Sequence, residues 1–197
     1  MGRGARLAAF VPVFLVLAAC STLPEPGIPQ PPLAARALAA NFTATGRVSA
    51  RVVGDAQRGF SGGFVWAHRP AGDTIELLTP LGQIAARMTL TAAGAEIELP
   101  DGRRTFTSDP EQFLSDALGA TLPVAALSYW LQAVPLAQLP FRAEVDAIGR
   151  PAALWQNGWQ IRYTAYADES AGAYPTRMQL NQGDIEARMV ISEWTPN

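Results

Sequence analysis

The chain has 197 residues, of which 49% are hydrophobic, 16% charged and 9% aromatic, so it has the composition of a folded protein with a core. All 15 basic residues are arginine, and there is one cysteine and one histidine, which excludes lysine chemistry, a disulfide framework and a Cys/His metal cage within one chain. The net charge of -2 does not favour binding to nucleic acid. We therefore expect no nucleic-acid partner, no metal site and no cofactor.

The N-terminus has the pattern of a lipoprotein signal peptide. Arg3 and Arg6 lead into an apolar run, Leu7–Leu17, that is shorter than the roughly 20 residues of a membrane span. Leu17-Ala18-Ala19-Cys20 resembles the bacterial lipobox, in which cleavage precedes a cysteine that carries a diacylglyceryl group and an N-acyl chain. The alternative is an ordinary secretory peptide with an incidental cysteine.

A proline-rich stretch follows the cysteine. Leu23–Pro32 holds five prolines in ten residues, which favours an extended tether, although an unstructured leader without a spacing role is the alternative. Ser21 takes the position at which aspartate directs enterobacterial lipoproteins to the inner membrane, so it favours the outer membrane. We expect three segments: a cleaved signal peptide at 1–19, the lipidated cysteine and tether at 20–32, and one domain at 33–197.

The body of the chain begins with an Ala-rich helix candidate, Leu33–Ala40, and then alternates with the period of β-strands. Asp101-Gly102 and Asn157-Gly158 are strong signals for two-residue hairpin turns. Strands are predicted at 42–53, 59–68, 74–79, 86–90, 95–99, 104–107, 141–145, 153–156, 159–166, 176–181 and 185–194. Antiparallel strands in this number form a barrel or a sandwich.

Two helices are expected between the two runs of strands. Ser108–Glu111 fits a capping box before the apolar positions Phe113, Leu114, Ala117 and Leu118, and a second amphipathic helix spans Pro123–Pro135. Such helices can cover one mouth of a barrel.

The sequence contains no evident catalytic site. His68 stands in a predicted turn and is expected to be exposed and inert, and no Gly-x-Ser-x-Gly or nucleotide-binding glycine motif occurs. Glu96 and Glu98 are assigned to a solvated strand edge. We therefore predict that the protein is not an enzyme and has no catalytic residues.

Apolar side chains offer the remaining candidates for a functional site. Leu81 stands at the tip of a Pro-Gly turn, where a contact with a membrane or partner competes with folding back onto the body. The candidates for an acyl-chain cavity are Phe64, Trp66, Leu77, Met88 and Trp130. For the aromatic residues the alternative is plain core packing.

Several motifs, in this order along the chain, resemble the LolB family of outer-membrane lipoprotein receptors. They are Gly46-Arg47, Phe64-Val65-Trp66, Leu78-Thr79-Pro80-Leu81-Gly82, Leu122-Pro123-Val124, Gln156-Asn157-Gly158-Trp159 and Met178-Gln179-Leu180. The resemblance implies a mainly β fold with a helical lid: an incomplete antiparallel β-barrel of about 10–11 strands that encloses an apolar cavity. One departure is Ala133, where relatives often have glycine.

The resemblance also implies a function. A protein anchored in the outer membrane through Cys20 and facing the periplasm would accept triacylated lipoproteins from the periplasmic carrier LolA. It would insert them into outer-membrane lipid with Leu81 as the exposed leucine of the insertion loop. A monomer is expected. Two rival interpretations stay open: a phospholipid or glycolipid carrier, and a structural envelope lipoprotein without a cavity.

Overall fold

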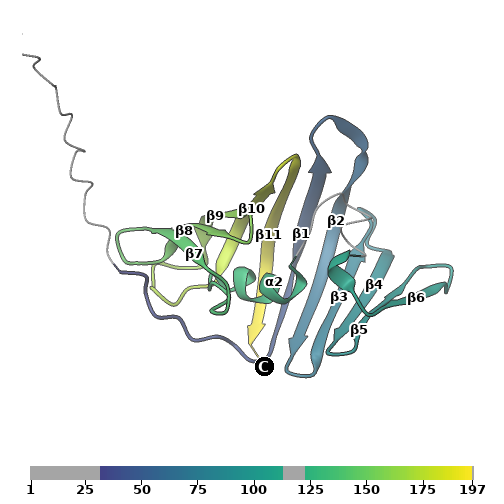
Figure 1. The fold of residues 1–197 in the computed structure, drawn as a ribbon, viewed down its shortest axis with the longest axis horizontal. Coiled ribbons are helices and arrows are strands. Elements are labelled where there is room, and N and C mark those ends of the chain that lie inside the picture. The colour runs from purple at the N-terminus through teal and green to yellow at the C-terminus, as the bar shows by residue number, and fades with distance from the viewer. Residues whose placement is uncertain (1–31, 113–122, 197) are drawn as a thin grey trace, which may run out of the picture.

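A computed structural model describes residues 32–112 and 123–196. Its eleven strands form one antiparallel sheet in the order β6-β5-β4-β3-β2-β1-β11-β10-β9-β8-β7, which does not close within the described residues (Figure 1). The strands are β1 (Phe42–Val52), β2 (Asp55–Arg69), β3 (Gly72–Leu78), β4 (Ile84–Thr91), β5 (Gly94–Glu98), β6 (Arg104–Thr107), β7 (Phe141–Val145), β8 (Pro151–Gln156), β9 (Trp159–Tyr166), β10 (Pro175–Gln182) and β11 (Ile185–Pro196). The predicted fold class, an incomplete antiparallel barrel, is confirmed.

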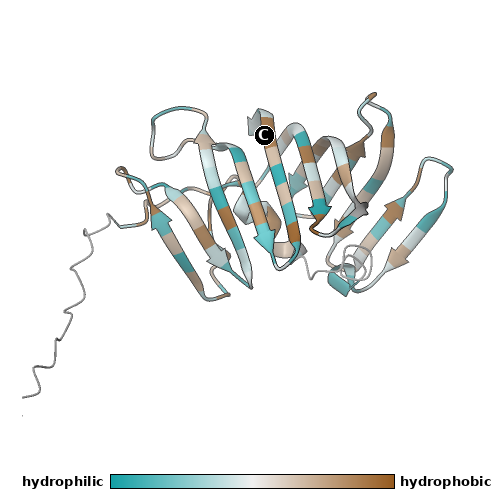
Figure 2. Cartoon of the chain, turned by 90° about the horizontal axis from the view of Figure 1, so that it is seen from above, coloured by the Kyte–Doolittle hydropathy of each residue, from teal (hydrophilic) through white to brown (hydrophobic). Residues whose placement is uncertain are grey.

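The topology is a chain of hairpins whose first and last strands meet. β1 pairs with both β2 and β11, so the two runs of strands share one continuous sheet. The predicted hairpin turns occur, with positive φ at Gly102, Asn157 and Gly158. Figure 2 shows apolar and polar residues alternating along the strands, which gives the sheet an inner face toward α2 (Val124–Leu131) and an outer polar face.

Gly46 explains why glycine stands in the middle of a long strand. The register between β1 and β11 shifts beside it, and a Cβ atom there would lie 2.0 Å from the carbonyl oxygen of Val190 and 3.0 Å from Cε1 of Phe64. Only glycine fits this close approach, and its missing side chain makes room for the Phe64 ring on the inner face.

The Ala-rich segment 33–40 corrects one expectation, because it is extended rather than helical. Its backbone bonds to the body instead: the amide of Ala34 donates to the carbonyl of Gly149 at 2.8 Å, and that of Ala39 to Oε1 of Gln132 at 2.8 Å. An isolated helix of this length is marginal, so tertiary contacts outweigh the helix propensity of alanine.

The helical region agrees with the prediction in part. Residues 110–112 are helical behind an Asp109 cap, whose Oδ1 accepts from the amide of Gln112 at 2.9 Å, and the predicted face Phe113, Leu114, Ala117 and Leu118 lies outside the described residues. α2 ends at Leu131 rather than near Pro135. Ala133 is buried and has a φ of 56°, the left-handed conformation that glycine favours. This backbone conformation is a physical reason for glycine at this position in the family that the sequence resembles.

Within residues 32–112 and 123–196, no helix combines the length and the apolar character needed to cross a membrane.

Candidate functional site

The inner face of the sheet has two halves that differ in packing. Over β8–β11, the start of β1 and the end of β2, the apolar side chains form one core with α2, and most are almost fully buried. We call this the packed half. Its largest fully buried side chains include Trp130, Phe42, Phe64, Leu131, Leu154, Ile161 and Met178.

A buried amide joins α2 to the packed half. Oε1 of Gln156 accepts from Nε1 of Trp130 at 2.8 Å and from the amide of Leu136 at 3.0 Å. Its Nε2 donates to the carbonyls of Leu136 and Leu139 at 2.9 and 3.0 Å. All four hydrogen-bonding positions of the amide are filled, so the strand holds both the helix and the segment after it.

The inner face of β3 and β4 is apolar but only partly covered. Ile75 pairs with Met88 and Leu77 with Ala86, and all four side chains are half-buried. We call these four residues the open half. A partly covered apolar surface of this kind can accept an apolar ligand at little cost in polar desolvation.

The structure separates the five predicted cavity residues into two groups. Leu77 and Met88 lie in the open half. Phe64, Trp66 and Trp130 are 2%, 4% and 0% exposed and belong to the packed core. Acyl contact with these three side chains therefore requires the core to move, and the acyl-binding role of all five remains a prediction.

A polar group closes the end of β2 next to this core. Oδ1 of Asp73 accepts from the indole Nε1 of Trp66 at 2.7 Å and lies 2.7 Å from Nδ1 of His68. The expectation that His68 is an exposed turn residue is wrong: it lies in β2, is half-buried, and stacks on Phe42 with ring centroids 5.0 Å apart. The strand continues to Arg69, immediately before Pro70, which brings His68 into the ladder opposite Asp73.

The turn between β3 and β4 projects Leu81 into solvent. The amide of Thr79 donates to the carbonyl of Gln83 at 2.7 Å, and that of Gly82 to the carbonyl of Thr79 at 2.9 Å. Gly82, with φ of 82°, supplies the left-handed residue that this turn needs. Leu81 is 88% exposed, so the alternative that it folds back onto the body is wrong. Backbone hydrogen bonds thus hold the turn in a conformation that exposes the side chain of Leu81.

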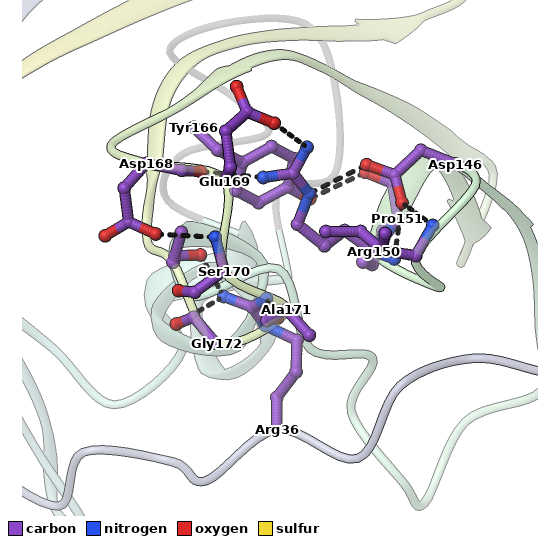
Figure 3. A network of polar contacts seen from close by, with 12 residues as sticks. Arg36, Asp146, Arg150, Pro151, Tyr166, Asp168, Glu169, Ser170, Ala171 and Gly172 are labelled. Carbon is purple, nitrogen blue, oxygen red and sulfur yellow. Dashed lines mark hydrogen bonds and ion pairs between the residues drawn. The ribbon is translucent and has the colours of Figure 1, made fainter.

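The opposite end of the strands, away from the Leu81 turn, is held together by arginine contacts. We call it the Arg36 edge; it comprises residues 33–41, the β7–β8 turn and the β9–β10 loop. Arg36 donates to the carbonyls of Ala171, Gly172 and Ala173 in the β9–β10 loop, and its Nε donates to the carbonyl of Gln132 at 3.1 Å (Figure 3). This side chain ties the start of the domain to the end of α2.

Tyr166 and Arg150 complete this edge. The guanidinium of Arg150 bonds to Asp146 at 2.7 Å and lies 4.6 Å from the Tyr166 ring centroid (Figure 3). Burial raises the pKa of the Tyr166 phenol, so the group stays protonated and donates to the carbonyl of Pro151. Burial also lowers the pKa of the Arg36 guanidinium.

Sequence reasoning missed the buried amides and the arginine clamp. Gln156 belongs to one of the motifs that resemble the LolB family, but a lone glutamine in a strand carries no signal of burial. Gln132 and Arg36 depend on contacts across 93 and 96 residues, which periodicity does not reveal. Cys20 lies outside the described residues, and no group of three or more His, Cys, Asp or Glu within those residues is placed to hold a metal ion.

Comparison with solved structures finds the same kind of fold in other proteins. A crystal structure of a LolA superfamily protein from Nitrosomonas europaea superposes with a TM-score of 0.51 at 10% identity, covering 82% of this chain and 88% of that chain. At this identity the likeness shows the fold alone.

Sequence comparison identifies the family. The family model for outer membrane lipoprotein LolB matches residues 40–194. The outer-membrane lipoprotein LolB of Azoarcus sp. (strain BH72) is 38% identical over 179 residues, or 91% of this chain and 89% of the relative. The LolB of Ralstonia nicotianae is 36% identical over 161 residues, or 75% and 77%. The chain belongs to the LolB family of outer-membrane lipoproteins, as the sequence resemblance predicted.

Proposed function

We propose that this protein accepts acylated lipoproteins from the periplasmic carrier LolA and inserts them into the outer membrane. The observation that carries the proposal is the position of the open half directly below an 88%-exposed leucine: β3 and β4 supply both the apolar face and the turn. Acyl chains held on Leu77 and Met88 would lie on the two strands that end in the insertion turn. Family membership supports lipoprotein cargo.

The energetics suit a carrier that uses no chemistry. Three acyl chains of about 16 carbons would expose about 48 methylenes to water, at about 0.8 kcal/mol each, an upper bound near 38 kcal/mol. A receptor has only to shield the acyl chains from water and to release them into a bilayer, which buries their apolar surface more completely. We propose that it acts without catalysis, and the open half is suited to that task because its side chains are apolar.

We propose that Cys20 carries the lipid anchor and that the domain faces the periplasm. The domain begins at the Arg36 edge, whereas strand alternation places the Leu81 turn at the opposite end of the strands. Residues 20–32 can span at most about 45 Å, and an eleven-residue strand such as β1 is about 37 Å long. A chain anchored at Cys20 is thus long enough to let the Leu81 turn meet the same membrane.

Removal of the lipid anchor tests whether the domain is a receptor by itself. Cys20→Ala should leave the fold intact and release the protein into the periplasm, and the released protein should still bind an acylated lipoprotein. Fractionation and pull-down with acylated cargo measure both effects. A well-folded Cys20→Ala protein that has lost its cargo would count against a self-contained receptor.

Transfer in two stages tests the role of Leu81. A labelled lipoprotein is passed from carrier to receptor and then from receptor to liposomes, with Leu81→Glu compared against Ile148→Glu. Ile148 is 45% exposed in the β7–β8 turn on the Arg36 edge, so it controls for an added carboxylate at an exposed turn. Leu81→Glu should accept cargo normally and fail to deliver it, because a carboxylate is costly to bury at the bilayer. Ile148→Glu should do both.

Other outcomes separate the rival functions. Normal delivery by Leu81→Glu would contradict the insertion role, and loss of acceptance would place the turn in the docking surface. Co-purification of phospholipid in place of acylated protein would favour a phospholipid or glycolipid carrier. A protein that binds neither would favour a structural lipoprotein.

A further inference from the structure

The outer face of the sheet has a basic surface that its ion pairs leave unneutralised. Four exposed arginines project from β1, β9, β10 and β11, and within the described residues none of them is within ion-pair distance of a carboxylate. They are Arg47, Arg162, Arg177 and Arg188, and we call them the arginine face. The acidic residues beside them are Glu193 and Glu186, and Glu186 is already paired with Arg51 at 2.6 Å. This face is positive in a chain whose net charge is -2.

The outer face of the other strands has the opposite arrangement. Arg87 lies 2.8 Å from Glu76 and 3.6 Å from Glu98, and Arg104 lies 3.4 Å from Glu96 and 3.2 Å from Glu98. Every arginine of the outer face of β3–β6 that the structure describes is thus neutralised. The contrast shows that the unpaired arginines are confined to one part of the sheet.

The arginine face is continuous with the Leu81 turn. Strand register places Arg177 opposite Val190, Val190 opposite Arg47, Arg47 opposite Gly63, and Gly63 opposite Leu78. Leu78 is the last residue of β3, so this row ends where the turn begins. Arg47 lies two strands from Leu78, about 10 Å at ordinary strand spacing. The row carries both charge and apolar surface.

Apolar side chains are exposed within the same surface. Val190, between Arg177 and Arg47, is 43% exposed, and Ile84, opposite Leu78 at the base of the turn, is 40% exposed. Next to this row lies a hollow of about 440 Å³, whose polar lining is Ser49, Ser61, Arg188 and the Arg51–Glu186 ion pair. Its hydroxyl groups and the guanidinium of Arg188 can donate to phosphate oxygens. Guanidinium groups, hydroxyl donors and scattered apolar side chains suit a bilayer surface with anionic headgroups.

We propose that the arginine face lies against anionic phospholipid headgroups when the Leu81 turn enters the bilayer. The inference rests on the proposed function, since it assumes that the turn meets the membrane. The free energy of membrane binding that Leu81 supplies is limited to the burial of its own side chain. A single contact of this kind does not fix the orientation of the protein on the membrane. Arginines two to five strands away from β3 fix the direction in which the sheet leans and hold the open half toward the site of release.

Vesicle sedimentation tests this orientation with a charge-matched control. The full chain carrying Cys20→Ala is mixed with phosphatidylethanolamine/phosphatidylcholine vesicles with or without phosphatidylglycerol. Arg47→Gln/Arg188→Gln is compared with Arg87→Gln/Arg104→Gln, which removes the same charge from the ion-paired part of the outer face. The first pair should weaken binding to phosphatidylglycerol vesicles by at least about tenfold, with the difference lost at high salt, and the second by less than about twofold.

Three results would overturn the proposal. Equal losses from both pairs would mean that net charge alone matters. An unchanged affinity for phosphatidylglycerol vesicles in the first pair would mean that the arginine face does not meet lipid. Normal vesicle binding with weaker docking of the carrier would assign the face to an acidic protein partner. Delivery of cargo to the same vesicles by Leu81→Glu separates this proposal from the proposed function. Normal delivery by Leu81→Glu would contradict the proposed function. A defect in Leu81→Glu without any defect in Arg47→Gln/Arg188→Gln would contradict only the orientation by the arginine face.

Discussion

The packed half and the open half are built from one sheet, yet they are organised for different tasks. In the packed half, α2 covers the strands and a fully bonded amide, Gln156, fixes the helix in place. In the open half, Leu77 and Met88 keep part of their surface exposed, and the strands end in a turn that exposes Leu81. The difference teaches that burial alone does not locate a lipid site here, because the most buried aromatic residues belong to the scaffold.

The outer face repeats this division. Ion pairs neutralise the arginines behind the open half, whereas the arginine face lies behind the packed half. The packed half therefore also carries the surface that we propose for membrane contact, and a closely packed part of the sheet is suited to orient the turn.

The largest expected effect comes from the amide of the packed half. Gln156→Leu would leave the indole of Trp130, the amide of Leu136 and the carbonyl of Leu139 without the partner that Gln156 supplies, so we expect a loss of about 3–5 kcal/mol in the free energy of unfolding. Urea denaturation measures it. A loss below about 1 kcal/mol would mean that water replaces the amide and that Gln156 does not hold α2 in place.

A pair of identical substitutions compares the two halves directly. Leu154→Ala removes a leucine that is 1% exposed in the packed half and should cost about 3 kcal/mol of stability with little effect on acyl binding. Leu77→Ala removes a half-buried leucine and should cost about 1 kcal/mol while weakening acyl binding more. Thermal unfolding and binding of acylated cargo are measured on both proteins. The reverse order of binding effects would place the acyl site in the packed half.

The smallest effect on stability is expected at the turn. Leu81 has almost no contact with the body, so Leu81→Glu should change the free energy of unfolding by no more than about 0.5 kcal/mol. Calorimetry of the variant beside the parent checks this. A larger loss would mean that a failure of delivery reports unfolding and not a missing insertion residue.

The sequence predicts the strands well because their signals are local. Alternation from Phe42 to Val52 and the Asn157-Gly158 turn act over a few residues, and the structure has both. It also predicts the turn at Leu81, because proline and glycine force it, but it leaves open whether Leu81 is exposed or folds back onto the body. The extended path of 33–40 and the half-buried position of His68 could not be predicted, since each is decided by partners from other elements, Gln132 and Gly149 in the first case and Phe42 in the second.

The cavity residues show the same limit. Hydrophobicity identifies Phe64, Trp66, Leu77, Met88 and Trp130 as inner-face residues, but it does not tell which of them α2 covers. That distinction depends on where the helix packs along the sheet. Gly46 leaves room for the Phe64 ring to pack into the core. This close approach becomes visible only when the three strands β11, β1 and β2 are placed together.

The central claim is that acyl chains bind to the open half, and photo-crosslinking during transfer tests it most directly. A photoreactive amino acid replaces Leu77 or Met88 in the open half, or Leu154 or Ile161 in the packed half, and the protein is irradiated while loaded with a lipoprotein whose acyl chains are labelled. The account predicts labelled adducts from Leu77 and Met88 and few from Leu154 and Ile161. Strong adducts from the two packed positions, with none from the open half, would contradict it.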